Sequence, residues 1–241
     1  TIQSVAGPDR TSCNNTPVQL GAIPTPTYLY SWSPVTGLNN PAISNPIATP
    51  AITTEYILTT SHEGGGCVSR DTVMVFAAIQ DSSIQLIGLN TFCLGDPQSA
   101  LLLVQPADSI QWYRNNIAIP GATQTQYSPI LSGTYYAAVF SFVGCVSTTD
   151  EIVITIHEVP VAAFLTDQVN QCYKDNLFSF TNTSTVASGT LLYDWDFGDG
   201  NTATTANTTH TYATPGTYQV RRNATSANGC KDTSITTVQV Y

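Results

Sequence analysis

The chain is short of charge, and above all of positive charge. Of its 241 residues only 7 are Lys or Arg and 16 are Asp or Glu, so its formal net charge is −9. An acidic surface repels a phosphate backbone, and Arg221-Arg222 is the largest basic cluster in the sequence. Nucleic acid is therefore not expected as a partner.

Long apolar runs are also missing. The longest, VMVFAAI at 73–79, is too short to cross a bilayer, and no signal-peptide pattern or initial Met is found. We expect no direct insertion into a membrane. Thr1 is interpreted as the start of a processed form or of an excised segment.

Catalytic motifs are absent as well. The sequence contains no GxSxG, no HExxH and no P-loop, and its three histidines are spread over the chain at His62, His157 and His210. We predict that the chain is not an enzyme and that His210 is a buried hydrogen-bonding residue.

The six cysteines that are present recur with a period. Cys13, Cys93 and Cys172 follow one another at almost equal intervals, and each begins a pair completed by a later cysteine. A regular period of this kind indicates a repeated structural unit.

Each pair of cysteines encloses one tryptophan. Trp32, Trp112 and Trp195 are the only tryptophans, and they precede the second cysteine of their pair by nearly equal gaps. We predict three domains of about 80 residues, with these tryptophans as core anchors. Their expected bounds are 1–79, 80–157 and 158–241.

The secondary-structure signal is β throughout. Alternating patterns run through YLYSW, SIQWY and YDWDF, turn residues recur about every 8 to 12 positions, and no useful 3.6-residue period appears. Short strands around one central tryptophan are typical of an immunoglobulin-like sandwich. The predicted fold is all-β, with three tandem immunoglobulin-like or PKD-like β-sandwich domains in an elongated rod.

One pair of cysteines in each repeat predicts one disulfide in each repeat. The bonds would clamp one end of each sandwich and place the protein outside a reducing cytosol, secreted or on a cell surface. A redox or metal role would need closely spaced cysteines, which the sequence lacks. The predicted pairs are Cys13–Cys67, Cys93–Cys145 and Cys172–Cys230.

The third repeat resembles a PKD domain. YDWDFGDG at 193–200, followed by THTYATPGTYQV at 209–220, carries this resemblance. In the first two repeats the stretches at 6–20 (AGPDRTSCNNTPVQL), 30–59 and 110–129 (IQWYRNNIAIPGATQTQYSP) are similar to the immunoglobulin-like and PKD-like repeats of large adhesins of Bacteroidetes bacteria. Examples of such adhesins are gliding-motility proteins exported by type IX secretion. The resemblance implies a non-catalytic stalk or adhesive segment of a longer protein.

The three aspartates of YDWDFGDG allow two interpretations. Asp194 and Asp196 would lie on the solvent face opposite Trp195, while Asp199 would help to form the turn. Some PKD domains are stabilised by calcium, so the resemblance also implies that Asp194, Asp196 and Asp199 are candidate calcium ligands.

The resembled bacteria glycosylate an Asp-[Ser/Thr]-apolar pattern, which makes Thr72 and Ser109 candidate glycosylation sites. The expected function is that of a disulfide-clamped adhesive rod. Its partners would be an extracellular polysaccharide, a protein surface or neighbouring copies of the chain.

Two other functions stay open. The chain could be a carbohydrate-binding accessory region of a secreted hydrolase, with Tyr113, Tyr127 and Tyr173 as candidate sugar-stacking residues. Alternatively, it could be the subunit of an extracellular filament that pairs edge strands between copies.

Overall fold

The structure is a computed structural model that describes residues 2–241, and within them it contains strands, turns and loops but no helix. The expectation about Thr1 lies outside these residues. Two compact units can be distinguished, and they are described separately. Unit 1 takes in the chain up to Ile87 with Leu101–Ser128 and Gly133–Val153; unit 2 takes in Gly88–Ala100, Pro129–Ser132 and Ile154–Tyr241.

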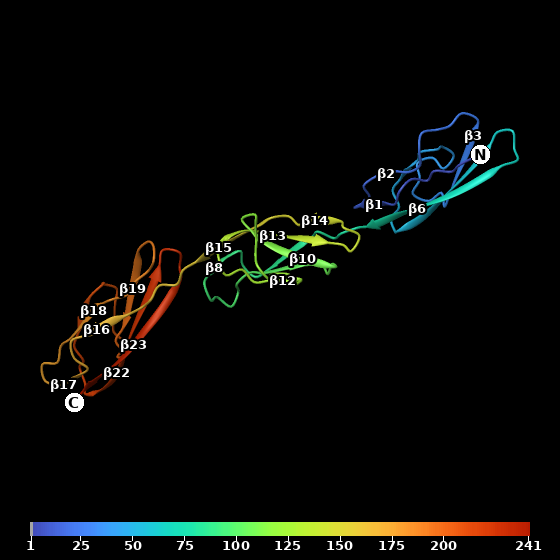
Figure 1. Cartoon of the computed structure of the whole chain (residues 1–241). Coiled ribbons are helices and arrows are strands. Elements are labelled where there is room, and N and C mark those ends of the chain that lie inside the picture. The colour runs from blue at the N-terminus through green and yellow to red at the C-terminus, as the bar shows by residue number, and fades with distance from the viewer. Residues whose placement is uncertain (1) are drawn as a thin grey trace. The chain divides into compact units, whose positions relative to one another are not determined.

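Unit 1 begins with a sandwich of two sheets (Figure 1). One sheet has the order β1-β6-β5-β3, and the second is the pair β2-β4. Its core contains Trp32, Tyr56, Leu58 and other apolar side chains. The strands are β1 (Arg10–Cys13), β2 (Val18–Gln19), β3 (Tyr28–Ser33), β4 (Ile47–Ala48), β5 (Thr54–His62) and β6 (Val68–Ala78).

The same unit holds a second pair of sheets. In one, β10 lies between β11 and β13, and β14 pairs with β13; the other has the order β12-β9-β7. The strands are β7 (Ile84–Ile87), β9 (Leu101–Val104), β10 (Ser109–Arg114), β11 (Ile117–Ala118), β12 (Gln126–Tyr127), β13 (Gly133–Phe140) and β14 (Val146–Thr148).

Unit 2 contains a third sandwich. Its sheets have the orders β16-β18-β21 and β17-β23-β22-β19-β20. In the same unit, β8 (Thr91–Cys93) pairs with Thr155–His157 of β15 (Ile152–His157). The strands of the third sandwich are β16 (Phe164–Thr166), β17 (Asn170–Gln171), β18 (Phe178–Asn182), β19 (Leu191–Asp196), β20 (Thr202–Ala203), β21 (Thr208–His210), β22 (Gly216–Ser226) and β23 (Lys231–Val240).

The fold class predicted from the sequence is confirmed as all-β with tandem sandwiches. Alternation explains the strands, because in β19 the buried Trp195 lies between the exposed Asp194 and the half-buried Asp196. The domain bounds 1–79, 80–157 and 158–241 stay predictions, since the two compact units divide the middle segment between them.

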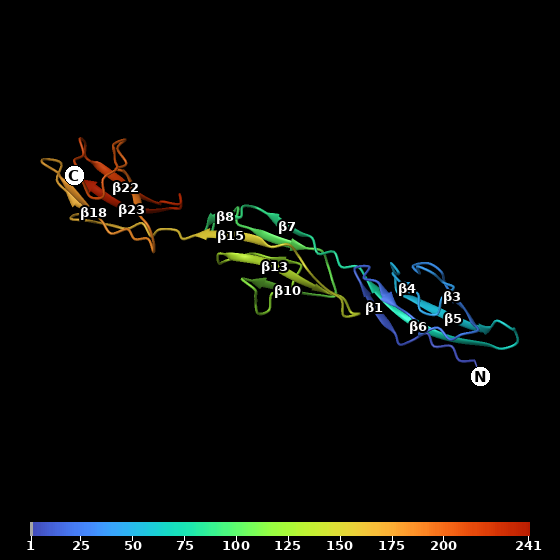
Figure 2. The same ribbon diagram turned by 90° about the horizontal axis from the view of Figure 1, so that it is seen from above.

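In each repeat, the last strand pairs in parallel with a short strand from near the beginning of that repeat. β1 pairs with β6, β8 with β15, and β17 with β23, all in parallel register. Within unit 1, both views show β1 and the arrowhead of β6 at one end of the sandwich and the β5–β6 turn at the other (Figures 1 and 2). We call these the exit end and the hairpin end of a sandwich.

Candidate functional site: cysteines at the two ends of each sandwich

The first cysteine of each repeat lies at the exit end. Cys13 is in register with Ala78, the last residue of β6, and Cys93 is in register with His157, the last residue of β15. In each repeat, the backbone N–H that follows the first cysteine donates to the carbonyl where the last strand finishes. These bonds are Asn14 to Ala78 at 2.9 Å, Leu94 to His157 at 2.9 Å and Tyr173 to Tyr241 at 2.7 Å.

The second cysteine of each repeat lies at the hairpin end. Cys67, Cys145 and Cys230 each come directly before the strand that follows the hairpin turn. The glycine before each cysteine has a positive φ, of 101°, 84° and 83° respectively. This conformation favours glycine and turns the chain tightly into the strand that follows.

The disulfide pairing predicted within each repeat is wrong. The structure joins Cys13 to Cys145 and Cys93 to Cys230, with Cα–Cα distances of 5.4 and 5.6 Å. The reason is the length of the last strand. Cys13 is level with Ala78 and Cys67 precedes Val68, so the eleven residues of β6 separate them by about 35 Å. A disulfide needs Cα atoms within about 7 Å.

Both bonds follow one rule: the first cysteine of a repeat pairs with the second cysteine of the next repeat. Asn14 supports the first bond, because its side-chain Nδ2 donates to Ser147 Oγ at 2.6 Å and its Oδ1 accepts from the Gln80 N–H at 2.8 Å. The disulfides therefore connect successive repeats and do not seal single ones.

Two cysteines do not take part in these bonds. Within residues 2–241, Cys67 and Cys172 are free thiols, and both are exposed. By contrast, Cys145 and Cys230 are each only 1% exposed. The prediction of six bonded cysteines fails for Cys67 and Cys172 in this chain.

The three tryptophans lie in the cores as expected, and each is at most 1% exposed. Each indole N–H also has a hydrogen-bond acceptor, namely a backbone carbonyl that comes later in the same repeat. This bond satisfies the polar end of a side chain that is otherwise buried in apolar surroundings. The acceptors are the carbonyls of Ile43, Gln124 and Thr205, at 2.9, 2.8 and 2.9 Å.

The three aspartates after Tyr193 have separate protein partners. Asp194 accepts a bond from Asn223 Nδ2 at 3.1 Å, and Asp196 accepts one from the Gly198 N–H at 2.9 Å. In the part of the chain that the structure describes, no three His, Cys, Asp or Glu side chains form a group that could hold a metal ion. The calcium site at Asp194, Asp196 and Asp199 stays a prediction.

Asp199 instead joins a turn to a neighbouring strand. Its Oδ2 lies 2.8 Å from His210 Nε2, and its two oxygens accept bonds from the backbone and side chain of Asn201. An ionised carboxylate can only accept, so the His210 ring donates from Nε2. The ring also stacks on Phe197 at 4.1 Å between centroids. His210 is thus a hydrogen-bonding residue of low exposure, with 12% of its side chain accessible.

The comparison with known families concerns this same segment. The family model described as the PKD domain matches residues 157–240. These residues form a PKD domain. The resemblance of the third repeat is thereby confirmed, while the comparisons do not show the Bacteroidetes adhesin type.

Solved structures are similar to parts of the chain or to all of it. The PKD1 domain of the Vibrio cholerae metalloprotease PrtV is 34% identical, over 34% of this chain and 96% of that one, with a TM-score of 0.31. The PKD1 domain of Vibrio anguillarum Epp is 29% identical, over 35% and 95%, with a TM-score of 0.31. The titin I-band fragment I67–I69 is 11% identical, over 99% and 96%, with a TM-score of 0.48.

Asp199 predicts how the PKD domain responds to acid. Partial burial alone would raise the pKa of Asp199, but the hydrogen bonds from His210 and Asn201 outweigh it and hold the pKa below its usual value. A lowered pKa stabilises the fold above the unfolded value of about 3.9 and loses that stabilisation as the pH falls through the folded value. Asp199→Asn should therefore cost about 1–2 kcal/mol at pH 7, and this cost should shrink as the pH falls through the folded pKa of Asp199.

The measurement is urea unfolding of both proteins between pH 2 and pH 7. Asp194→Asn is the matched control, because its exposed carboxylate accepts one bond only. It should change the free energy of unfolding by less than about 0.5 kcal/mol at every pH. A loss that is independent of pH in Asp199→Asn would show that the charge of Asp199 is not responsible.

Arg222 is a residue whose role the sequence did not reveal. Its partner across the β19–β22 pair is Trp195, and it is 0% exposed. The guanidinium lies 4.3 Å from the ring centre of Tyr193 and 4.2 Å from that of Trp195. Nε donates to Ser184 Oγ and Nη1 to the Ala206 carbonyl, whereas Nη2 has no partner among residues 2–241. Burial lowers the pKa of Arg222.

In this environment we expect the aliphatic part of the Arg222 side chain to contribute more to the free energy of unfolding than its charge does. Arg222→Met keeps an unbranched apolar side chain and removes an incompletely bonded cation, so the free energy of unfolding should stay within about 1 kcal/mol or rise. Arg222→Ala should lower it by about 2–4 kcal/mol, because packing on both rings is lost. Thermal unfolding of both variants checks this; equal losses would instead assign the stabilisation to the charge.

The three candidate sugar-stacking tyrosines have different surroundings. Tyr113 stacks on Tyr136 at 4.9 Å, and Tyr127 packs against the buried Trp112 at 5.8 Å. Tyr173 belongs to unit 2 and is 47% exposed. A role of these three tyrosines in sugar binding stays a prediction.

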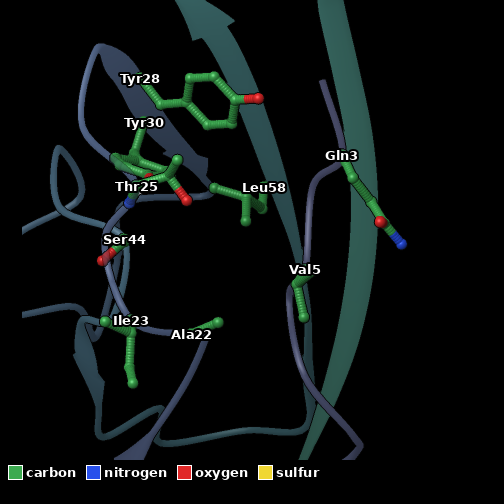
Figure 3. Close-up of a pocket in the computed structure, with 9 residues that line it drawn as sticks. All are labelled: Gln3, Val5, Ala22, Ile23, Thr25, Tyr28, Tyr30, Ser44 and Leu58. Atoms are coloured by element: carbon green, nitrogen blue, oxygen red, sulfur yellow. Dashed lines mark hydrogen bonds between the residues drawn. The ribbon is translucent and has the colours of Figure 1, made fainter. Parts of the chain in front are cut away.

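A hollow in unit 1 is lined by Tyr28, Tyr30, Ile23 and neighbouring residues (Figure 3). Its volume is about 80 Å³, whereas ligand pockets usually reach about 300–1,000 Å³. The Tyr30 hydroxyl, which lines this hollow, already accepts a hydrogen bond from the Thr25 N–H at 2.7 Å. The hollow gives no support for a sugar site.

The two candidate glycosylation sites are both exposed. Thr72 lies in β6 and Ser109 begins β10, and the aspartate before each accepts a backbone hydrogen bond, from Ala6 and Phe142 respectively. Their modification stays a prediction. Within residues 2–241, no helix is long and apolar enough to cross a membrane.

Proposed function

We propose that the chain is a non-catalytic segment of an extracellular or cell-surface adhesin, and that its role is to keep its length under tension. The observation that carries this proposal is the pair of disulfides that join each first cysteine to the second cysteine of the next repeat. Disulfides persist in oxidising surroundings, which supports an extracellular location. The PKD domain and the β-sandwich array fit a structural segment.

The two disulfides overlap along the sequence. One closes the chain from Cys13 to Cys145 and the other from Cys93 to Cys230, so the segment 93–145 lies inside both loops. A pulling force takes the shortest covalent route, which crosses both bonds and leaves most of the first and third repeats without load. Those repeats can then unfold without lengthening the chain.

Overlap also gives a second route if one bond is broken. When either disulfide is reduced, the other still bypasses one of the two outer repeats. An adhesive segment outside the cell, exposed to changing force and redox conditions, would benefit from this redundancy.

Single-molecule stretching tests the proposal. At forces that unfold β-sandwiches, the oxidised chain should lengthen far less than the same chain after reduction. Equal lengthening in the two states would contradict a tension-bearing role for the disulfides, whatever surface the adhesin contacts.

A further inference from the structure

The free thiols occupy places that are bonded in the other repeats. Cys172 is a first cysteine, like Cys13 and Cys93, while Cys67 is a second cysteine, like Cys145 and Cys230. Every first cysteine that has a following repeat is bonded to it. Every second cysteine that has a preceding repeat is bonded to that one.

Cys172 has the backbone setting of a bonded first cysteine. The N–H after it donates to the carbonyl of Tyr241 at 2.7 Å, as Asn14 and Leu94 do at their own exit ends. Immediately before it, Gln171 pairs in parallel with Val240 in β23. The exit end of the PKD domain thus presents its thiol on the same scaffold that holds Cys13 and Cys93.

Cys67 has the setting of a bonded second cysteine. It follows a glycine with a positive φ and comes directly before a strand, as Cys145 and Cys230 do. Its turn differs in composition. Ser141 and Ser226 lie four residues before Cys145 and Cys230 and accept hydrogen bonds from their N–H groups, whereas Glu63 is found four residues before Cys67. The thiol of Cys67 is exposed where the thiols of its two counterparts are bonded and buried.

We propose that Cys67 and Cys172 each form a further disulfide between successive repeats, of the same kind as Cys13–Cys145 and Cys93–Cys230. Cys172 forms a disulfide with the second cysteine of a following β-sandwich, and Cys67 forms one with the first cysteine of a preceding β-sandwich. The partner is a repeat of this type, either elsewhere in the same polypeptide or on a second copy of the chain. This proposal does not depend on the tension-bearing function.

The chemistry is an ordinary oxidation of two thiols. The two cysteines give up two protons and two electrons to a disulfide oxidant, which is reduced to two thiols, and an S–S bond forms between the repeats. Oxidised glutathione provides such an oxidant in the test below.

The test uses a second copy of this chain as the partner. Cys67→Ser keeps the Cys172 thiol, and Cys172→Ser keeps the Cys67 thiol. Both replaced side chains are exposed, so both variants should fold. One variant carries a mass tag, the two are mixed in equal amounts with oxidised glutathione, and the products are separated on a non-reducing gel.

The mixed dimer should exceed each dimer of like variants by at least about tenfold, which corresponds to about 1.4 kcal/mol of preference. The same mixture in urea serves as the control and should give random proportions, and the double variant should stay monomeric. Random proportions in the folded mixture, or monomers that carry only glutathione, would overturn the proposal.

Peptide mapping of the protein isolated from its own source distinguishes the two partner sources. A Cys67–Cys172 peptide from protein that migrates as a multimer on a non-reducing gel would indicate a second copy, and a peptide that joins either residue to another sequence would indicate a further repeat. Free thiols at both positions, or a bond from Cys67 to Cys13, would contradict the proposal.

Discussion

Trp195→Ala should lower the free energy of unfolding of the PKD domain by about 3–5 kcal/mol. The indole is 0% exposed and lies 5.0 Å from the Phe164 ring and 5.7 Å from the Phe180 ring. Its removal leaves a cavity and also takes away one of the two rings that flank the Arg222 guanidinium. For a domain of this size, each kcal/mol of lost stability lowers Tm by about 4–8 °C, so the Tm of the PKD domain should fall by at least about 12 °C.

Hydrogen exchange is the suitable measurement, because it reports the stability of residues 157–240 separately from the rest of the chain. Trp195→Phe should lower the free energy of unfolding by less, because it keeps an aromatic ring in the core. Some loss should remain, because the Thr205 carbonyl no longer has its indole donor. Leu192→Ala is the matched control: it lies in the same strand, is 70% exposed and should change stability by less than about 0.5 kcal/mol. If Trp195→Ala were no worse than this control, the core role of Trp195 would be wrong.

The core could be predicted from sequence because one rule determines it. Successive side chains of a strand point to opposite faces, so the pattern around each tryptophan identifies the buried face without knowledge of the partner strands. Trp32, Trp112 and Trp195 also recur at nearly equal distances from the second cysteine of their pair. Periodicity and alternation together were enough for the all-β repeats.

The disulfide partners could not be predicted in the same way. Six cysteines allow fifteen connectivities, and a regular period is equally compatible with bonds inside repeats and with bonds between successive ones. The deciding fact is that the first cysteine is level with the end of the last strand, as Cys13 is with Ala78. This is a parallel register between segments from the beginning and the end of a repeat, and local sequence patterns do not specify it.

Arg222 shows a second limit. Next to Arg221 it resembles half of a solvent-exposed basic pair, but alternation in β22 sends the two side chains to opposite faces. The position opposite the tryptophan is occupied by Leu58 in the first repeat and by Ala137 in the second. Alignment of the three repeats therefore indicates that position 222 is buried, although an arginine at this position suggests a solvent-exposed residue.

Stretching the chain should give the second large effect. Cys13 and Cys230 lie near opposite ends of the sequence, but the shortest covalent route between them follows the two disulfides and the segment from Cys93 to Cys145. At about 3.6 Å per residue, the oxidised route of about 52 residues (145 minus 93) can reach about 190 Å. The reduced span of about 217 residues (230 minus 13) can reach about 780 Å. Extension curves of single molecules with and without a reducing agent measure this difference directly.

Removing one bond tests both the connectivity and its redundancy. In the variant that carries Cys13→Ser and Cys145→Ser, the Cys93–Cys230 bond remains, and the route from residue 13 to Cys93 contains about 80 residues, or about 290 Å. If the bonds instead lay within repeats, this variant would retain only Cys172–Cys230. Its span would then contain about 159 residues (172 minus 13) and reach about 570 Å. The shorter value is expected because overlapping loops limit extension even after one of them has opened.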